Sequence, residues 1–312
     1  MTPPLFSLPE FGPPGPFNAA WVEGAGGVRL RTALFPAAEP RGSVILSTGR
    51  TEFIEKYFEV IGELLARGFT VLVHDWRGQG LSDRLIPDAP LKGHATGVEP
   101  FLDDLAAVVA AHESALPRPW IAMGHSMGGA LTLIAVGEGR LAVEAVVLSA
   151  PMLGIATGAA PRWLARGLAW LLSRVGGVRA SVQASVSPLD ETFDLGANPL
   201  THNRTRWERT QALLRAHPKL ALGAPTWGWV DFAFVLAARL RRDATRFPVP
   251  LTVVAAGDER LVDTSATQAF CARSPRPRCE VVDGSRHELL MESDPVRERF
   301  LAAFDEATTS IA

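Results

Sequence analysis

The stretch GHSMGG at residues 124–129 decides the fold, because it stands between an apolar run at 120–123 and a helical pattern at 128–137. Only small residues fit beside a serine at so tight a strand-to-helix turn, which explains the glycines of a G-x-S-x-G pattern. Such a turn projects the hydroxyl at the carboxyl end of the strand, where open α/β sheets bind ligands. The start of the following helix also stabilises negative charge. Ser126 is therefore the candidate nucleophile.

The same alternation extends outward from this stretch. Two strands are expected within residues 20–36, around a Gly-rich turn at 24–27. Short apolar runs that alternate with helical patterns follow at 44–46, 71–73, 120–123, 146–148, 251–254 and 280–282. Alternation of this kind is typical of parallel strands joined by crossover helices. The pattern predicts an α/β fold with a mostly parallel, eight-stranded sheet flanked by helices.

One long interruption divides this pattern. Residues 153–246 are mostly helical in pattern and contain five of the eight tryptophans. We expect a helical cap, or lid, at 153–246, inserted after the sixth strand. The α/β core is then formed by residues 19–152 and 247–312, and residues 1–18, rich in proline and glycine, form an extended arm.

Composition excludes several classes of protein. The net charge of −2 over 312 residues gives no basic field for nucleic acid. The absence of a signal-peptide pattern and of an eighteen-residue apolar run predicts a cytoplasmic protein. Cys271 and Cys279 have no metal-binding spacing, and for a cytoplasmic protein we expect them to be reduced thiols in a helix and a strand.

A serine nucleophile needs a base, and the base needs an acid that orients it. His287 follows the last predicted strand and precedes the last predicted helix, which is the place for the base in the chain order Ser, acid, His. Three carboxylates follow the strand at 251–256: Asp258, Glu259 and Asp263. Asp263 also suits the cap of the next helix. Spacing alone does not choose between Asp258 and Glu259.

The elbow GHSMGG resembles that of monoacylglycerol lipases and bacterial lysophospholipases in the α/β-hydrolase superfamily. The resemblance extends over roughly residues 40–305. Further segments that carry it are STGRTE at 47–52, similar to the family's oxyanion loop, HDWRGQGLS at 74–82, LSAPM at 148–152, NPLT at 198–201 and GAPT at 223–226.

The resemblance implies an α/β-hydrolase fold and a site that needs no metal or organic cofactor. The family's acid-Arg-hydrophobe-hydrophobe-Asp pattern fits residues 259–263, so the resemblance makes Glu259 the acid and leaves Asp258 as its rival. The backbone N–H groups of Met127 and Arg50 are the expected oxyanion hole. The implied substrate is a small-molecule lipid ester with one acyl chain, a lysophospholipid or a monoacylglycerol.

The predicted cap is basic on an acidic body, because residues 153–246 carry a net charge of +7 and the rest of the chain −9. A helix expected at 162–174 combines Trp, Leu and Arg, which suits an anionic membrane surface or an acyl-chain site. The first of these interpretations places the protein peripherally on the inner membrane face. A lid helix that packs on the core, with solvated arginines, is an equal alternative.

Two other functions stay open. Proline-releasing aminopeptidases share this fold and triad order, although they need an acidic group for the substrate amine, which a basic cap disfavours. A catalytically silent binding protein that uses the fold as a scaffold is the second.

Overall fold

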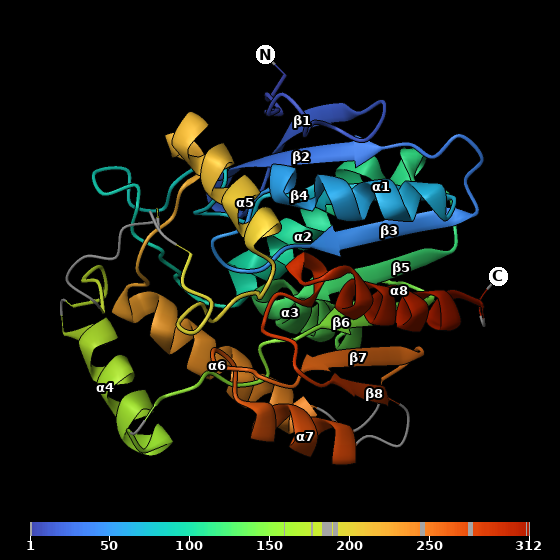
Figure 1. Ribbon diagram of the computed structural model, residues 1–312. Helices are drawn as coiled ribbons and strands as arrows, with labels where there is room; N and C mark the ends of the chain where they lie inside the picture. The colour runs from blue at the N-terminus through green and yellow to red at the C-terminus, as the bar shows by residue number, and fades with distance from the viewer. Residues whose placement is uncertain are drawn as a thin grey trace.

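The computed structural model describes residues 2–158, 160–175, 177–182, 189, 193–243, 247–273, 277–309 and 311. Its centre is one sheet with the order β1-β2-β4-β3-β5-β6-β7-β8 (Figure 1). The strands are β1 (Asn18–Glu23), β2 (Arg29–Phe35), β3 (Gly42–Ser47), β4 (Phe69–His74), β5 (Trp120–His125), β6 (Ala145–Ser149), β7 (Leu251–Ala256) and β8 (Pro277–Val282).

The sheet is mostly parallel, as the sequence predicts. β2 pairs antiparallel with β1 and β4, whereas the strands from β4 to β8 pair parallel with one another. The parallel strands β3 to β7 are buried along their whole length. Strands covered on both faces read as continuous apolar runs, and this is the pattern that located them in the sequence.

Helices cover both faces of the sheet. The elements outside the sheet and before the cap are α1 (Phe58–Ala66), α2 (Glu99–His112) and α3 (Ser126–Gly137), and those near the C-terminus are α7 (Thr264–Arg273) and α8 (Asp294–Thr309). Apolar side chains of α1 and α8 share one buried cluster, and those of α2, α3 and α7 share another. The chain therefore has the three-layer α/β architecture that the alternation predicts.

Three helices lie between β6 and β7: α4 (Arg162–Arg174), α5 (Arg204–Ala216) and α6 (Trp227–Asp243). α6 packs against both α3 and α4. α5 is tied to the core through Arg206, which binds Glu59 of α1 at 2.6 Å and Asp294 of α8 at 2.6 Å. The cap predicted after the sixth strand is therefore helical; residues 159, 176, 183–188, 190–192 and 244–246 of that prediction lie outside the described residues.

The prediction of reduced thiols was wrong. Cys271 of α7 and Cys279 of β8 form a disulfide. The two Cα atoms lie 6.2 Å apart, within the range that a disulfide requires. The prediction was wrong because it rested on the assumption of a cytoplasmic protein. The spacing of eight residues between the two cysteines does not reveal that their Cα atoms lie close together.

Within the part of the chain that the structure describes, no helix is long and apolar enough to cross a bilayer.

Candidate active site

Ser126 occupies a sharp turn between β5 and α3. Its φ of 50° lies in the left-handed region, which a non-glycine residue adopts only at an energetic cost and which often marks a functional site. The neighbouring glycines are required by close packing. A Cβ on Gly128 would lie 2.3 Å from the carbonyl oxygen of Thr48, and one on Gly124 would lie 2.7 Å from the Cα of Gly129. The turn leaves the Ser126 side chain at the carboxyl end of β5.

His287 connects Ser126 to an acidic side chain. Its Nε2 lies 2.8 Å from Ser126 Oγ, and its Nδ1 lies 2.7 Å from Glu259 Oε2. The other carboxylate oxygen of Glu259 accepts the backbone N–H groups of residues 260–262 at 2.9, 2.8 and 3.2 Å. Burial opposes ionisation of Glu259, but His287 and the N–H groups of Leu261 and Val262 lower its pKa below the usual value. The carboxylate is thus held ionised and aimed at the imidazole.

Asp258 takes a different position. Its side chain is 40% exposed and pairs with Arg260 at 2.9 Å and Arg286 at 3.5 Å. The hydrogen bond from Arg260 holds the pKa of Asp258 below its usual value. Asp263, the third carboxylate of this region, accepts the backbone N–H of Ser265 at 2.9 Å at the start of α7. The structure therefore brings together Ser126, His287 and Glu259, and it leaves the rival acid at the surface.

The loop expected to form the oxyanion hole follows β3, and two side chains of the segment after β4 donate hydrogen bonds to its backbone carbonyls. Gln79 Nε2 donates to the carbonyl of Gly49 at 2.7 Å, and Trp76 Nε1 donates to that of Thr48 at 2.8 Å. Both donors belong to the segment at 74–82, whose role the sequence had not revealed. Arg50 lines the same pocket as Ser126. Met127 is the second residue of α3, so its N–H has no partner inside the helix.

A buried ionic cluster joins this loop to the segment that carries His287. Lys56 Nζ lies 2.9 Å from Glu52 and 2.6 Å from Glu288, the residue next to His287. Glu52 also accepts the Tyr57 hydroxyl at 2.5 Å and the backbone N–H of Gly49. Although burial opposes ionisation, Lys56 lowers the pKa of Glu52 to about 2, whereas burial raises the pKa of Glu288. Sequence reasoning missed this cluster, and the spacing of Glu52 and Lys56 by one helical turn was the available signal.

His125, directly before the nucleophile, is a neutral packing residue. Its Nδ1 lies 3.1 Å from the carbonyl oxygen of Ser149, and burial lowers the pKa of His125 to about 4. His125 is therefore uncharged at neutral pH and takes no part in the contact between Ser126 and His287.

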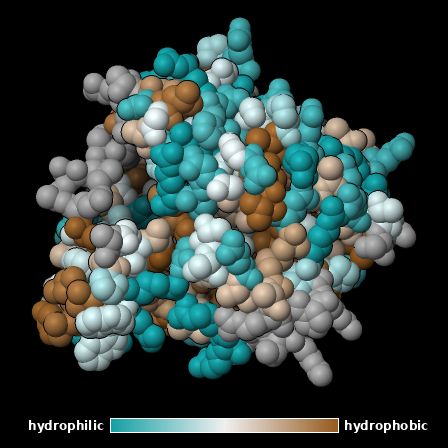
Figure 2. All heavy atoms as spheres, turned by 60° about the horizontal axis from the view of Figure 1, so that its bottom comes forward, coloured by the Kyte–Doolittle hydropathy of each residue, from teal (hydrophilic) through white to brown (hydrophobic). Residues whose placement is uncertain are grey.

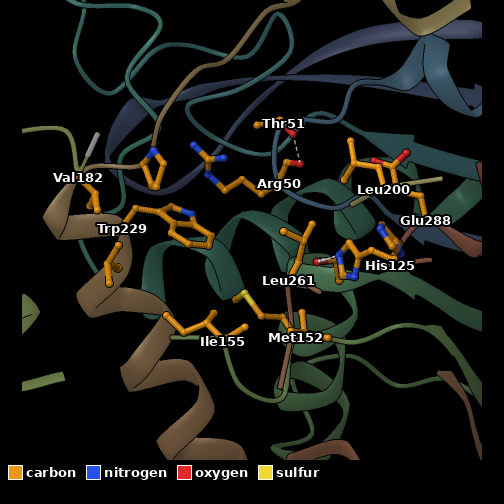
Figure 3. A pocket seen from close by; sticks show the side chains of 16 residues that line it. Arg50, Thr51, His125, Met152, Ile155, Val182, Leu200, Trp229, Leu261 and Glu288 are labelled. Atoms are coloured by element: carbon orange, nitrogen blue, oxygen red, sulfur yellow. Dashed lines mark hydrogen bonds between the residues drawn. The ribbon is translucent and has the colours of Figure 1, made fainter. Parts of the chain in front are cut away.

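A pocket of about 400 Å³ opens onto Ser126 and His287 (Figure 3). Its wall is largely apolar and comes from the core and the cap; the apolar members include Met152, Ile155, Ala156, Val182, Leu200, Pro225, Trp229, Val230, Leu261 and Val262. Among the described residues, no group of His, Cys, Asp and Glu side chains is arranged to hold a metal ion. The pocket can admit an apolar chain beside a serine hydroxyl that faces a histidine.

The eight-stranded sheet and the strand-to-helix serine turn are those of an α/β-hydrolase. A family model described as serine aminopeptidase, S33, matches residues 38–294, and the chain belongs to this family of hydrolases.

Known relatives match nearly the whole chain. Lysophospholipase L2 of Escherichia coli (strain K12) is 30% identical over 93% of this chain and 88% of its own length. A monoacylglycerol lipase of Mycolicibacterium smegmatis is 26% identical over 87% of this chain and 90% of its own length. Among solved structures, the monoacylglycerol lipase of Paleococcus ferrophilus has a TM-score of 0.71 at 20% identity, covering 90% of this chain and 98% of that one. The last likeness concerns the fold alone.

Proposed function

We propose that this protein is a serine carboxylic-ester hydrolase that cleaves a lipid ester with one acyl chain through an acyl-enzyme on Ser126. The observation that carries the proposal is the continuous contact from Ser126 Oγ through His287 to Glu259. The apolar pocket beside Ser126 supports an acyl chain as the bound group. The names of the relatives, lysophospholipase and monoacylglycerol lipase, support the same substrate class.

In this proposal His287 Nε2 takes the proton of Ser126 as the hydroxyl oxygen attacks the ester carbonyl carbon. Glu259 holds the imidazole in the tautomer with its proton on Nδ1 and stabilises the imidazolium that forms. The backbone N–H groups of Met127 and Arg50 bind the developing oxyanion. One such donor typically lowers the barrier by about 3–4 kcal/mol.

The tetrahedral intermediate then expels the alcohol, which leaves with the proton from His287. Water attacks the acyl-enzyme with His287 again as base, and the fatty acid is released as Ser126 regains its proton. Every proton transfer in this sequence passes through His287. The sequence of steps uses side chains that the fold already holds in contact.

Peripheral membrane contact through α4 belongs to the same proposal. α4 exposes Trp163 at 75% and Trp170 at 53%, and Ala169 is its buried residue. Figure 2 shows an apolar patch at the lower left, where α4 lies. The same helix carries Arg162, Arg166 and Arg174, of which Arg162 pairs with Asp263 and Arg174 with Asp231. An apolar face with arginines suits an anionic lipid surface. The boundaries between arm, core and cap, and the cytoplasmic location, stay predictions.

A peptidase is the second candidate, because the matching family is described as serine aminopeptidase. Such an enzyme needs a carboxylate for the substrate amine. Glu288 is the acidic residue that lines the described pocket, and it is already paired with Lys56. This pairing favours an ester over a peptide with a free amine.

One panel separates the alternatives. A lysophospholipid and a monoacylglycerol with the same acyl chain, and an aminoacyl-arylamide, are assayed in parallel. We expect turnover of at least one lipid and none of the arylamide. A fluorophosphonate probe that fails to label Ser126 would instead indicate a binding protein, and turnover of the arylamide alone would contradict the lipid assignment.

A further inference from the structure

The side chain of Arg50 is a half-buried cation in the wall of the pocket, and among the described residues no acidic side chain pairs with it. Its Nη2 donates to the backbone carbonyl of Gly223, and its Nε is buried with no hydrogen-bond partner. Within the described ranges, no carboxylate lies within ion-pair distance of this guanidinium. Burial alone acts on its charge and lowers the pKa of Arg50 to about 10, so that it stays protonated at neutral pH.

Among the described residues, the fully buried cations are paired with acids, whereas half-buried Arg84 bonds to backbone carbonyls alone. The acid-paired cations include Arg31 with Glu55 and Asp75, Lys56 with Glu52 and Glu288, and Arg77 with Asp104. A buried charge without a counter-ion destabilises a protein unless something else compensates it. Arg50 differs from Arg84 in lying at the wall of the pocket that contains Ser126. An anionic ligand would supply the missing charge.

The surroundings of Arg50 hold its guanidinium in one place. It lies over the Trp229 ring at 5.0 Å from the ring centroid, and the close-up shows the side chain running along the pocket wall toward Trp229 (Figure 3). On its other side, a Cβ on Gly93 would lie 2.4 Å from Arg50 Nη2, so a glycine is required for this position of the guanidinium. The arginine is thus fixed before any ligand binds, which favours tight recognition.

The length of the Arg50 side chain sets the distance between its backbone N–H and its guanidinium. Its backbone N–H is the proposed oxyanion donor, and its guanidinium stands at the far end of the same residue. In a lysophospholipid a similar number of bonds separates the ester carbonyl from the phosphate. An ester held at the backbone of Arg50 can therefore present its phosphate to the side chain of Arg50, and guanidinium groups suit phosphate oxygens.

We propose that the Arg50 guanidinium binds the head-group phosphate of a lysophospholipid whose ester lies at Ser126. This proposal rests on the proposed function and deepens it, because it selects the phosphate-bearing lipid over the neutral monoacylglycerol. Arg50 is then a specificity-determining residue through its side chain, separately from its backbone N–H.

The test measures a ratio of specificities. kcat/KM is determined for lysophosphatidylcholine and for monoacylglycerol with the same short acyl chain, both below their critical micelle concentrations, so that membrane binding does not contribute. We expect Arg50→Met to lower the ratio of the two values about 10- to 100-fold, with Arg50→Lys between it and the wild type. Gly93→Ala, which displaces the guanidinium and retains the arginine, should lower the ratio in the same direction.

Arg215→Met is the matched control, because Arg215 is an exposed arginine of α5 and its loss changes the net charge equally. Its ratio should equal that of the wild type. An unchanged ratio in both Arg50→Met and Gly93→Ala overturns the proposal and leaves Arg50 as a tether between the loop and Gly223.

A second measurement needs no lipid turnover, so the proposal can fail separately from the proposed function. Glycerol 3-phosphate should slow fluorophosphonate labelling of Ser126 in the wild type, and Arg50→Met should weaken this protection about 10-fold or more. Equal protection in both proteins, or none in either, contradicts a phosphate site. Protection by octanoate in place of glycerol 3-phosphate would assign Arg50 to the carboxylate of the released fatty acid and overturn the proposal.

Discussion

Charged side chains occur both around Ser126, at the carboxyl ends of the strands, and on helix α4 of the cap, but in opposite settings; the first of these regions is called the rim below. At the rim, charged groups such as Lys56 and Glu52 are buried and in contact with one another. On α4, Trp163 and Trp170 are mostly exposed. Arg174 of this helix is also exposed and lies 3.4 Å from Asp231. The difference shows that the charged groups around Ser126 are held in fixed positions by one another, whereas the tryptophans of α4 are exposed to solvent.

The largest expected effect concerns the acid of the rim. Glu259→Gln should lower kcat on a p-nitrophenyl ester by about 10³- to 10⁴-fold, because an amide no longer fixes the His287 tautomer or stabilises its charge. Asp258→Asn, the matched change one residue earlier at an exposed position, should stay within about threefold of the wild type. A larger loss in Asp258→Asn than in Glu259→Gln would reverse the assignment.

The next effect concerns the stability of the rim. Lys56→Met leaves two buried carboxylates without their cation and should lower the free energy of unfolding by about 3–5 kcal/mol, measured by urea denaturation. Lys219→Met, at an exposed lysine, should change it by less than about 0.5 kcal/mol. Equal stabilities of the two variants would show that the cluster contributes nothing to the rim.

Acid should lower the free energy of unfolding, because two buried histidines are neutral in the folded protein. Burial lowers the pKa of His125 to about 4 and that of His74 to about 3, so below pH 6.5 the unfolded chain binds more protons than the folded one. Stability should therefore fall as the pH drops from 6.5 toward 4, by about 2 kcal/mol per histidine at pH 5. Urea midpoints at pH 7 and 5 measure this fall. His74→Phe should lose less stability on acidification than the wild type, and an identical loss would exclude His74 as a source.

The smallest effect on folding is expected on α4. Trp163→Ala removes a side chain that is 75% exposed and should change the free energy of unfolding by less than about 0.5 kcal/mol. The same change should weaken binding to anionic vesicles about 3- to 10-fold, because the apolar area that enters the interface is lost. Trp207→Ala on α5, where the side chain is 8% exposed, should instead destabilise the fold by about 3 kcal/mol. Vesicle binding that is unaffected by Trp163→Ala would leave α4 as an ordinary lid helix.

The sequence predicted the fold well because buried parallel strands and the serine turn leave local signals. The strands from β3 to β7 are continuous apolar runs, and the glycines beside Ser126 follow from contacts that any such turn must make. The choice between Glu259 and Asp258 had no local signal, because adjacent residues differ only in the direction of their side chains. The resemblance to a family favoured Glu259, and the structure places Glu259 against His287.

Features that depend on contacts between residues far apart in the chain, or on how neighbouring elements pack, could not be predicted from the sequence. The pairing of Lys56 with Glu288 joins positions 232 residues apart, and the Cys271–Cys279 disulfide depends on how α7 and β8 lie relative to each other. The unpaired charge of Arg50 is likewise visible only once its neighbours are known. In the sequence it is one arginine among many.

The most direct test of the central claim is the reactivity of Ser126 itself. Fluorophosphonate labelling, followed by mass spectrometry of the modified peptide, should place the adduct on Ser126 in the wild type. Ser126→Ala should abolish labelling and lower ester hydrolysis by about 10³-fold or more, with unchanged urea denaturation. Near-normal hydrolysis by a folded Ser126→Ala protein would contradict the account.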